Sequence, residues 1–482
     1  MRFATELAAA RSAQEAWCRL PVRDRLRPVR SLRALLVERT DDLVLAVGQD
    51  IARSPVEVVA TELLPSAAAL KFLEQRAARV LAPTRIGWGL RPTWLTGCRD
   101  VIHRRPWGVV GVIGTWNYPV FLNVGPIAQA LVAGNAVLWK PSENAPRTAE
   151  LTHALFREAG FPAGLLQRLP ATREAGPQLA EADIDFLVFT GSDAVGRKLA
   201  ARLGERLVPS TLELSGCDAM FVLADADLDL AAKAAWFAVS LNRGQTCIAV
   251  RRVFVQRLRY AEFLDKVRGY FEAAQPVPLV TAGQRTQAAD LVADAVTRGA
   301  QPIGGRGDGP EGSVYPILLA DLPADARFCT EACFAPVAGV IPFETIDDAV
   351  SLAKRSGFGL GASVFTADTT AAQDLAARLP AGVVTVNDVL APTAHPATPF
   401  GGRGQSGWGV TQGAEGLLGL TVPQVVTVRK GSFRPHLDEA VRPHPVATYD
   451  IMRGLLRWTH ARGLREKLRG LRQMIGGARR KR

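Results

Sequence analysis

The chain has 482 residues, of which 48% are hydrophobic and 22% charged, and its formal net charge at pH 7 is +12. This composition is typical of a soluble globular protein, and the length is too great for one simple core, so we expect two to three domains. Six scattered cysteines without a CxxC pair argue against a disulfide framework, a zinc site or a redox dithiol, and they suit a reducing cytoplasm.

The N-terminal region predicts helices and shows no leader peptide. Charged residues are scattered through residues 1–20, and no apolar run in the chain approaches the ~20 residues that a membrane span needs. Residues 1–80 space Leu, Ala and Val between charged residues, which predicts helices. Residues 81–106 are broken by Pro and Gly, and we expect them to cross between lobes.

Apolar strands then alternate with helices, which is typical of βαβ units and a parallel sheet. Candidate strands of a first series lie at 109–114, 136–140 and 185–190, each followed by a helical stretch. A second series runs from about Ala219 to Val386, with MFVLA, RRVFVQ, GVIPF, ASVFT and GVVTV as candidate strands. Two α/β lobes in sequence indicate a cleft between them, which is a common place for a ligand.

Polar residues and a glycine follow these first strands. Asn117 in IGTWNYP could hold a developing oxyanion with its amide, or it could be a turn asparagine before Tyr-Pro. Lys140 and Glu143 in KPSEN could hold the two hydroxyls of a ribose, whereas Ser142 with Glu143 could equally mark a helix start. FTGSDAVGR opens a helix with Gly191, which suits a pyrophosphate, although the GxGxxG fingerprint is absent.

Two further residues, Glu213 and Cys247, have the chemistry of a catalytic pair. Glu213 lies in an apolar run, LELSGCDAM, where a carboxylate is costly unless it has a partner or a task. Burial would raise its pKa towards neutrality, as suits a general base for water; a buried structural carboxylate is the alternative. Cys247 follows Gly-Gln-Thr, but most free cysteines are buried and inert. The glycine-rich stretch at 399–409 is by composition only a flexible loop.

The order of these motifs decides between the alternatives. TWNYP, KPSE, FTGSxxVGR, LEL-SG, GQTC, CFAPV and PFGGxGxSGxG follow one another, and in them the chain resembles the aldehyde dehydrogenase superfamily from about residue 1 to residue 429. It looks most like the class-three branch, which handles aromatic and fatty aldehydes. The resemblance implies an α/β fold with a Rossmann-like cofactor lobe, a catalytic α/β lobe and a small β arm that pairs subunits.

The resemblance also implies a domain organisation and an oligomer. We expect a homodimer, with a tetramer as the alternative. The expected segments are 1–87 and 107–215 for the NAD(P)-binding domain, 216–415 for the catalytic domain, 88–106 and 416–429 for the oligomerisation arm, and 430–482 for a basic tail.

In the reaction that the resemblance implies, Cys247 attacks the aldehyde carbon. The Asn117 amide and the backbone N–H of Cys247 hold the oxyanion, and hydride passes to the nicotinamide. Glu213 then activates the water that hydrolyses the thioester. NAD is favoured over NADP because Glu143 would accept from a free 2′-hydroxyl, and no metal is implied. The implied cofactor contacts are Trp116, Lys140, Ser142, Glu143, Gly191, Ser192, Val195, Leu214 and Phe334.

The sequence departs from the family at three places near this site. Ser215 and Cys217 stand where the family has Gly and Lys, and Ala332 replaces the glutamate that holds the nicotinamide ribose. A less fixed nicotinamide predicts a slow enzyme, because hydride transfer depends steeply on orientation. Two alternatives stay open. One is a CoA-acylating or acyl-phosphate-type reductase, against which Glu213 argues, and the other is a catalytically weak scaffold tethered by its tail.

Most of the positive charge lies in the tail. Residues 430–482 hold 14 Lys and Arg against four Asp and Glu. Leu464, Leu468, Leu471 and Ile475 form one helical stripe, and the basic residues lie largely off it. Such a helix, with Trp458 beside it, suits an anionic membrane surface through residues 451–482. Packing on the dimer or over the substrate mouth is the alternative. Nucleic acid fits poorly, because interleaved aromatic residues are lacking.

The tail and the resemblance together predict the substrate and the location. We expect a cytoplasmic enzyme, peripheral at the inner face of a membrane if its tail binds lipid. Its small-molecule substrate would be an apolar, fatty or aromatic aldehyde. Gly125 stands where many relatives place a bulky side chain, which indicates a wide substrate tunnel.

Overall fold

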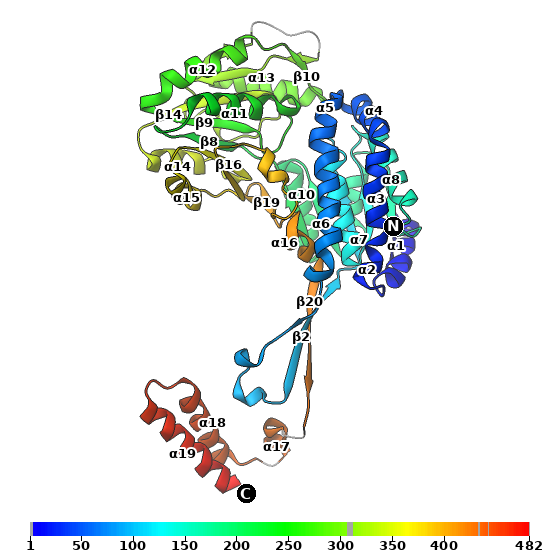
Figure 1. The fold of residues 1–482 in the computed structure, drawn as a ribbon, viewed down its shortest axis with the longest axis vertical. Coiled ribbons are helices and arrows are strands. Elements are labelled where there is room, and N and C mark those ends of the chain that lie inside the picture. Colours follow the sequence, from blue (N-terminus) through cyan, green and yellow to red (C-terminus); the bar gives the residue numbers. More distant parts are fainter. Residues whose placement is uncertain (1–2, 306–311, 432–433, 442, 482) are drawn as a thin grey trace. The chain divides into compact units, whose positions relative to one another are not determined.

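The computed structural model describes residues 3–305, 312–431, 434–441 and 443–481. The chain divides into two units (Figure 1). The first comprises Met1–Pro83 and His103–Gln424, and the second comprises Thr84–Ile102 and Val425–Arg482.

The first unit begins with helices, as the spaced apolar residues predict. Val29, Leu32 and Leu36 lie on one face of the third helix and are buried. Between the fourth and sixth helices, a capping box of Ser54 and Glu57 starts a short helix that runs into a π-helical turn. The elements are α1 (Ala4–Trp17), α2 (Val22–Arg25), α3 (Arg27–Glu38), α4 (Thr40–Ile51), α5 (Pro55–Val58), η1 (Val59–Leu63) and α6 (Leu64–Val80).

A six-stranded sheet in the order β19-β7-β6-β3-β4-β5 forms the first lobe. Its strands are parallel except β19, which pairs with β7 in the antiparallel sense. The strands are β3 (Val109–Ile113), β4 (Ala136–Lys140), β5 (Leu166–Arg168), β6 (Phe186–Thr190), β7 (Ser210–Glu213) and β19 (Gly407–Trp408). The helices between them are α7 (Phe121–Ala133), α8 (Pro146–Glu158), α9 (Ala175–Glu181) and α10 (Asp193–Glu205).

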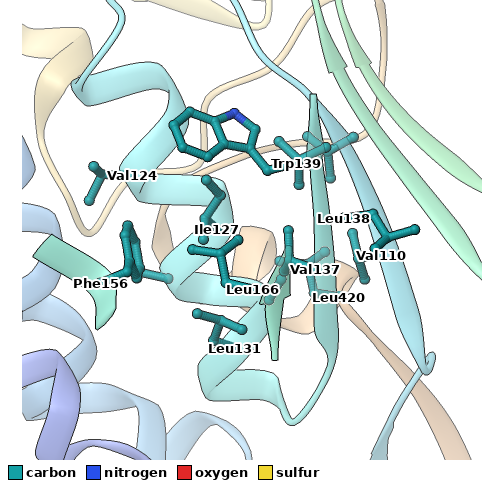
Figure 2. Packing of buried hydrophobic residues seen from close by; sticks show 14 of the residues in the cluster. Val110, Val124, Ile127, Leu131, Val137, Leu138, Trp139, Phe156, Leu166 and Leu420 are labelled. Atoms are coloured by element: carbon teal, nitrogen blue, oxygen red, sulfur yellow. The ribbon is translucent and has the colours of Figure 1, made fainter. Parts of the chain in front are cut away.

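Helix α7 packs against β3 and β4 of this sheet. Figure 2 shows Val124, Ile127 and Leu131 of α7 in one cluster with Val137 of β4 and Leu166 of β5. The central strands β3, β4 and β6 are buried along their whole length, as parallel strands covered on both faces are.

A seven-stranded sheet in the order β11-β13-β14-β9-β8-β16-β17 forms the second lobe, and all its pairings except β11 with β13 are parallel. Residues of α11 and α12 pack in one core cluster with β8 and β9, and residues of α13, α14 and α15 pack in another. The strands are β8 (Asp218–Val222), β9 (Val250–Gln256), β11 (Gln301–Gly304), β13 (Ile317–Ala320), β14 (Val337–Phe343), β16 (Gly361–Phe365) and β17 (Val383–Val386). The helices are α11 (Leu228–Ser240), α12 (Tyr260–Glu272), α13 (Ala282–Thr297), α14 (Ile346–Lys354) and α15 (Thr369–Arg378).

The predicted α/β fold and its strands are confirmed, and two local predictions are wrong. The glycine-rich stretch at 399–409 is more than a flexible loop, because β18 (Arg403–Gly404) pairs with β15 (Phe358–Gly359) and β19 with β7. Ser142 does not start a helix. Its Oγ accepts from the N–H of Asn144 at 3.2 Å in a local turn, and α8 begins only at Pro146. The predicted domain boundaries stay a prediction.

The second unit contains a small sheet and the tail. The strands β1 (Thr84–Arg85), β2 (Cys98–Pro106) and β20 (Thr421–Arg429) form a three-stranded sheet in that order. Strands β2 and β20 lie in the two segments predicted to form the arm, whereas β1 lies in segment 1–87, which was predicted to belong to the NAD(P)-binding domain. The tail forms α17 (Pro435–Val441), α18 (Pro445–His460) and α19 (Leu464–Lys481). The predicted helix is therefore present in α19, and α18 is an additional one. Among the described residues, no helix is long and apolar enough to cross a bilayer.

Helices α18 and α19 pack closely because glycines line their contact. A Cβ added at Gly454 would lie 2.6 Å from the carbonyl oxygen of Gly470, and one added at Gly477 would lie 2.8 Å from that of Ala447. The large apolar side chains of the pair consequently point elsewhere, and many are exposed. These are Val446, Tyr449, Met452 and Leu456 on α18 and Leu464, Leu468 and Ile475 on α19.

Candidate active site

The first sheet brings most of the predicted site residues to one edge. Asn117 follows β3, Lys140 ends β4, Gly191 follows β6 and Glu213 ends β7. These four strands are parallel neighbours, so their carboxyl ends lie side by side. This edge is where open α/β sheets bind ligands.

Cys247 lies against Glu213. The thiol donates to Oε1 of Glu213 across 3.6 Å, although the two residues come from different lobes. Glu213 is only 3% exposed, and burial raises its pKa to about 7, against the opposing effect of the thiol hydrogen bond. Burial also raises the pKa of Cys247 well above its ordinary value, and the carboxylates of Glu213 and Asp218 raise it further. The pair is therefore a protonated thiol beside a carboxylate that can take its proton near neutral pH.

The loop before Cys247 is held in a strained conformation. Asn242, Arg243 and Gly244 have φ values of 49°, 58° and 72°, and the left-handed region costs a non-glycine residue about 1–2 kcal/mol. Arg251, 1% exposed, donates to the carbonyl oxygens of Gly244 and, at 2.5 Å, Ala335. This buried cation fastens the nucleophile loop to the segment that carries Phe334.

Asn117 has a fixed, buried amide next to the same loop. Its Nδ2 donates to the carbonyl oxygen of Gln245 at 3.1 Å, and its Oδ1 accepts from the hydroxyl of Thr115 at 2.8 Å. The amide has two N–H donors, so one remains for a substrate oxygen. This position differs from that of a solvent-exposed turn asparagine.

A buried ion pair under this region was missed by the sequence analysis. Glu62 accepts from Arg53 at 2.7 Å and from two backbone N–H groups at the start of α7, at 3.0 and 2.8 Å. The guanidinium of Arg53 lies 4.3 Å from the ring centroid of Tyr118, whose hydroxyl is 2.7 Å from that of Thr246. The network thus reaches the residue before Cys247. A glutamate within the apolar stretch TELLPSAAAL was the available signal, by the argument used for Glu213.

The predicted ribose contacts form a charged cluster at the end of β4. Lys140 Nζ lies 3.1 Å from one carboxylate oxygen of Glu143, and Arg173 Nε lies 2.9 Å from the other. Lys140 and Ser142 are buried, whereas Arg173 is largely exposed. Arg173 was not predicted, because the loop after β5 has no motif to mark it.

The predicted pyrophosphate turn is the start of α10. Ser192 caps this helix, and its Oγ accepts from the N–H of Val195 at 3.4 Å. A Cβ added at Gly196 would lie 2.4 Å from Leu214, so the helix packs closely on the residue after Glu213. A helix start with free N–H groups at a sheet edge suits an anionic phosphate.

Near the predicted nicotinamide position, the aromatic contact is present and the carboxylate is not. The rings of Trp116 and Phe334 meet edge to face with centroids 5.8 Å apart. Ala332 has no carboxylate, and that of neighbouring Glu331 is paired with Arg327 at 2.7 Å. The carboxylate of Glu331 is therefore engaged elsewhere and does not take the place of the glutamate that the resemblance implies at position 332.

The segment that follows Glu213 is closely packed. A Cβ added at Gly216 would lie 2.4 Å from the carbonyl oxygen of Cys247, so the glycine that this chain keeps is the one in close contact. Cys217 is buried, with Sγ 3.7 Å from the carbonyl oxygen of Phe328. Ser215 accepts at its carbonyl oxygen from the hydroxyl of Ser406 at 2.8 Å.

A pocket lined by residues of α6 and α7 extends to Glu213. Its wall is mostly apolar and includes Leu70, Phe72 and Leu73, and none of its described lining residues is Lys or Arg. Gly125 also lines it, and a Cβ added there would meet nothing within 4 Å. The pocket thus has room for a side chain at Gly125, and the wide substrate tunnel stays a prediction.

Comparisons with known proteins point to one family. A protein-family model described as the aldehyde dehydrogenase family matches residues 2–426. A 4,4′-diapolycopene aldehyde oxidase of Methylomonas sp. is 35% identical, over 94% of this chain and 86% of that protein. A putative NADP+ succinate-semialdehyde dehydrogenase of Mycolicibacterium smegmatis is 33% identical, over 89% of this chain and 84% of that one. The crystal structure of a Mycobacterium tuberculosis aldehyde dehydrogenase complexed with NAD+ has a TM-score of 0.83 and 31% identity, over 89% of this chain and 90% of that chain.

Proposed function

The chain belongs to the aldehyde dehydrogenase family and is an NAD(P)-dependent enzyme, and on this premise we propose that it oxidises an apolar aldehyde to the carboxylic acid through a thioester on Cys247. The observation that carries the proposal is the contact of the Cys247 thiol with Glu213, 3.6 Å apart, at the end of an apolar cavity. Such a pair supplies both the nucleophile and the base of an oxidative hydrolysis.

The residues at the sheet edge fit the cofactor. A helix start capped by Ser192 would hold the pyrophosphate, and the buried Lys140 with Glu143 would hold the adenosine ribose. Trp116, Ser142, Gly191, Val195, Leu214 and Phe334 complete the proposed contacts. When bound, NAD(P) supplies the acceptor for the hydride of the aldehyde.

The protein residues would carry out the remaining steps in sequence. Glu213 takes the thiol proton, and the thiolate of Cys247 bonds to the aldehyde carbon. The free N–H of the Asn117 amide and the backbone N–H of Cys247 hold the resulting oxyanion. After hydride loss gives the thioester, Glu213 releases its proton and takes one from water. The hydroxide oxygen bonds to the thioester carbon, the carbon–sulfur bond breaks, and Cys247 leaves as a thiolate.

The cavity favours an apolar aldehyde over a semialdehyde that carries a carboxylate. One similar protein is named for an aldehyde of 4,4′-diapolycopene and another for succinate semialdehyde. A second carboxylate in the cavity would lack a cation among the described lining residues and would face Glu213, and an unpaired buried charge costs several kcal/mol. The first kind of substrate suits the wall better.

The test is NADH production with straight-chain aldehydes of increasing length, aromatic aldehydes and succinate semialdehyde. We expect kcat/KM to rise with chain length and to vanish in Cys247→Ala. A preference for succinate semialdehyde would contradict the substrate assignment. Adding CoA or phosphate to the same assay tests the reductase alternative, which predicts that either one accelerates turnover. Cofactor binding without turnover would favour the scaffold alternative.

The C-terminal helices support a proposed attachment to an anionic membrane surface. Three residues of the predicted stripe, Leu464, Leu468 and Ile475, are exposed on α19 rather than packed against α18. Basic residues, among them Arg465 and Arg469, lie on another side of the same helix. The exposed apolar side suits insertion between lipid chains, and the flanking cations suit the negative charge of anionic headgroups.

Sedimentation with liposomes tests this attachment. The full chain should sediment with vesicles that contain anionic lipid and much less with neutral ones, and a chain that ends before Lys430 should remain in the supernatant. Equal sedimentation with and without the tail would contradict the proposal. The proposed dimer, paired through the β1-β2-β20 sheet, is tested by sedimentation velocity on both chains.

A further inference from the structure

Two carboxamides line the cavity that is otherwise largely apolar. Gln129 of α7 is 6% exposed, and within the part of the chain that the structure describes its side chain makes no hydrogen bond. The Oε1 of Gln412 is also buried and has no partner among the described residues. Buried polar side chains are in most cases paired, so two carboxamides without protein partners among the residues that line one cavity call for a partner that enters it.

Gln412 keeps its side chain there at the expense of backbone strain. Its φ of 60° and ψ of 169° lie in a region that is almost restricted to glycine. Gly413 follows with a φ of 62° and begins α16 (Gly413–Gly419), which packs against α6 and α7. A glycine at position 412 would relieve the strain, so the retained glutamine indicates a use for its carboxamide.

Gln129 lies at a distance from the reacting atoms. Phe121, Gly125 and Gln129 are spaced i, i+4 and i+8 along α7, so they follow one another on one face of the helix. The eight steps from Phe121 to Gln129 span ~12 Å at a rise of 1.5 Å per residue. Asn117 lies four residues before Phe121, and Glu213, which contacts the Cys247 thiol, lines the same cavity, so a substrate chain that starts there would run past Gly125 to reach Gln129.

We propose that Gln129 and Gln412 form a second polar subsite, which binds an uncharged oxygen group on the apolar chain of the substrate. The substrate is then a bifunctional aldehyde that carries a hydroxyl or a second carbonyl remote from the reacting one. A carboxamide both donates and accepts, so it takes either group, whereas it offers no cation for a carboxylate. The inference rests on the proposed function, because Cys247 must oxidise the other end.

The first experiment measures kcat/KM for an alkanal, its ω-hydroxy derivative and the α,ω-dialdehyde of equal chain length. The wild type should prefer the bifunctional compounds by roughly tenfold, as one or two neutral hydrogen bonds allow. Gln129→Leu and Gln412→Gly should lose this preference and still oxidise the alkanal. Gln412→Gly also relieves the strained backbone, so it should not unfold the protein. Gln275→Leu, at an exposed position outside the cavity, is the matched control.

The second experiment measures binding without turnover, by titration calorimetry of Cys247→Ala with an alkanol and the corresponding α,ω-diol. Tighter binding of the diol, lost on adding Gln129→Leu, supports the subsite even if no aldehyde is oxidised, in which case the proposed function alone fails. Oxidation of alkanals with no preference in any variant, and equal binding of alcohol and diol, would overturn the subsite and leave the proposed function intact.

Discussion

Breaking the buried pair of Arg53 and Glu62 tests how the nucleophile loop is supported. In Glu62→Gln, the guanidinium of Arg53, whose side chain is 1% exposed, loses its charged partner and keeps a neutral carboxamide oxygen and the face of Tyr118. A buried charge without its partner costs about 3–5 kcal/mol, a large share of the about 5–15 kcal/mol that stabilises a typical protein. Two of the guanidinium nitrogens already lack partners among the described residues, so little can compensate.

The reverse change should be milder. In Arg53→Met, Glu62 keeps its two backbone N–H donors at the start of α7, so we expect a loss of about 1.5–3 kcal/mol, the worth of one charged hydrogen bond. The double variant removes both charges and should cost clearly less than the sum of the single ones.

Urea unfolding followed by tryptophan fluorescence gives these free energies, and the rate of Cys247 alkylation by iodoacetamide reports the loop. The single variants should slow or misdirect alkylation, because Tyr118 and Thr246 connect the pair to the loop. Unfolding free energies that add within about 0.5 kcal/mol would refute the coupling. Unchanged alkylation in Glu62→Gln would refute the connection to the loop.

Three further changes test the site. Burial raises the pKa of Glu213 to about 7, so turnover should fall as the pH drops through 7 and the carboxylate becomes protonated. Glu213→Gln should give one burst of NADH per site in stopped flow and an acyl-enzyme in the mass spectrum. Unimpaired steady-state turnover in this variant would exclude Glu213 as the base. Gly125→Phe fills the open space and should lower kcat/KM for long aldehydes at least tenfold with little change for acetaldehyde; an equal loss for both would place the tunnel elsewhere. Arg173→Ala removes the exposed cation beside Glu143 and should weaken NADP binding about tenfold relative to NAD binding, as measured by cofactor fluorescence. An unchanged ratio of the two dissociation constants would show that Arg173 does not reach the 2′-phosphate of NADP.

The site residues at the sheet edge could be predicted from the sequence because their positions depend on local patterns. Each candidate residue follows an apolar strand, and parallel strands place such residues at one edge without any long-range information. The contact between Glu213 and Cys247 is different, since neither spacing nor periodicity relates a residue in one lobe to a loop of the other. Only the resemblance to a family implied it. The assignment to the class-three branch stays a prediction.

The parts that were missed depend on tertiary contacts. Arg251 and Arg53 look like ordinary charged residues in the sequence. Nothing local indicates that Arg251 donates to buried carbonyl oxygens or that Arg53 pairs with a buried carboxylate. The composition of residues 399–409 hides two short strands, because glycine has a low strand propensity. Gly407 is nevertheless required, since a Cβ there would lie 2.0 Å from the carbonyl oxygen of Leu212.

The antiparallel pairing of β19 with β7 has a consequence for how the protein is made. Glu213 pairs with Gly407, so the strand that carries Glu213 gains its outer neighbour only after nearly two hundred further residues have been synthesised. At about 5–20 residues per second, the ribosome needs roughly 10–40 s for that stretch. Cys247 is synthesised during this interval, before β7 has gained β19 as its neighbour. Assembly of the reactive pair is thereby postponed until both lobes have been translated, and a chain that stops short of β19 would expose a thiol without the finished site around it.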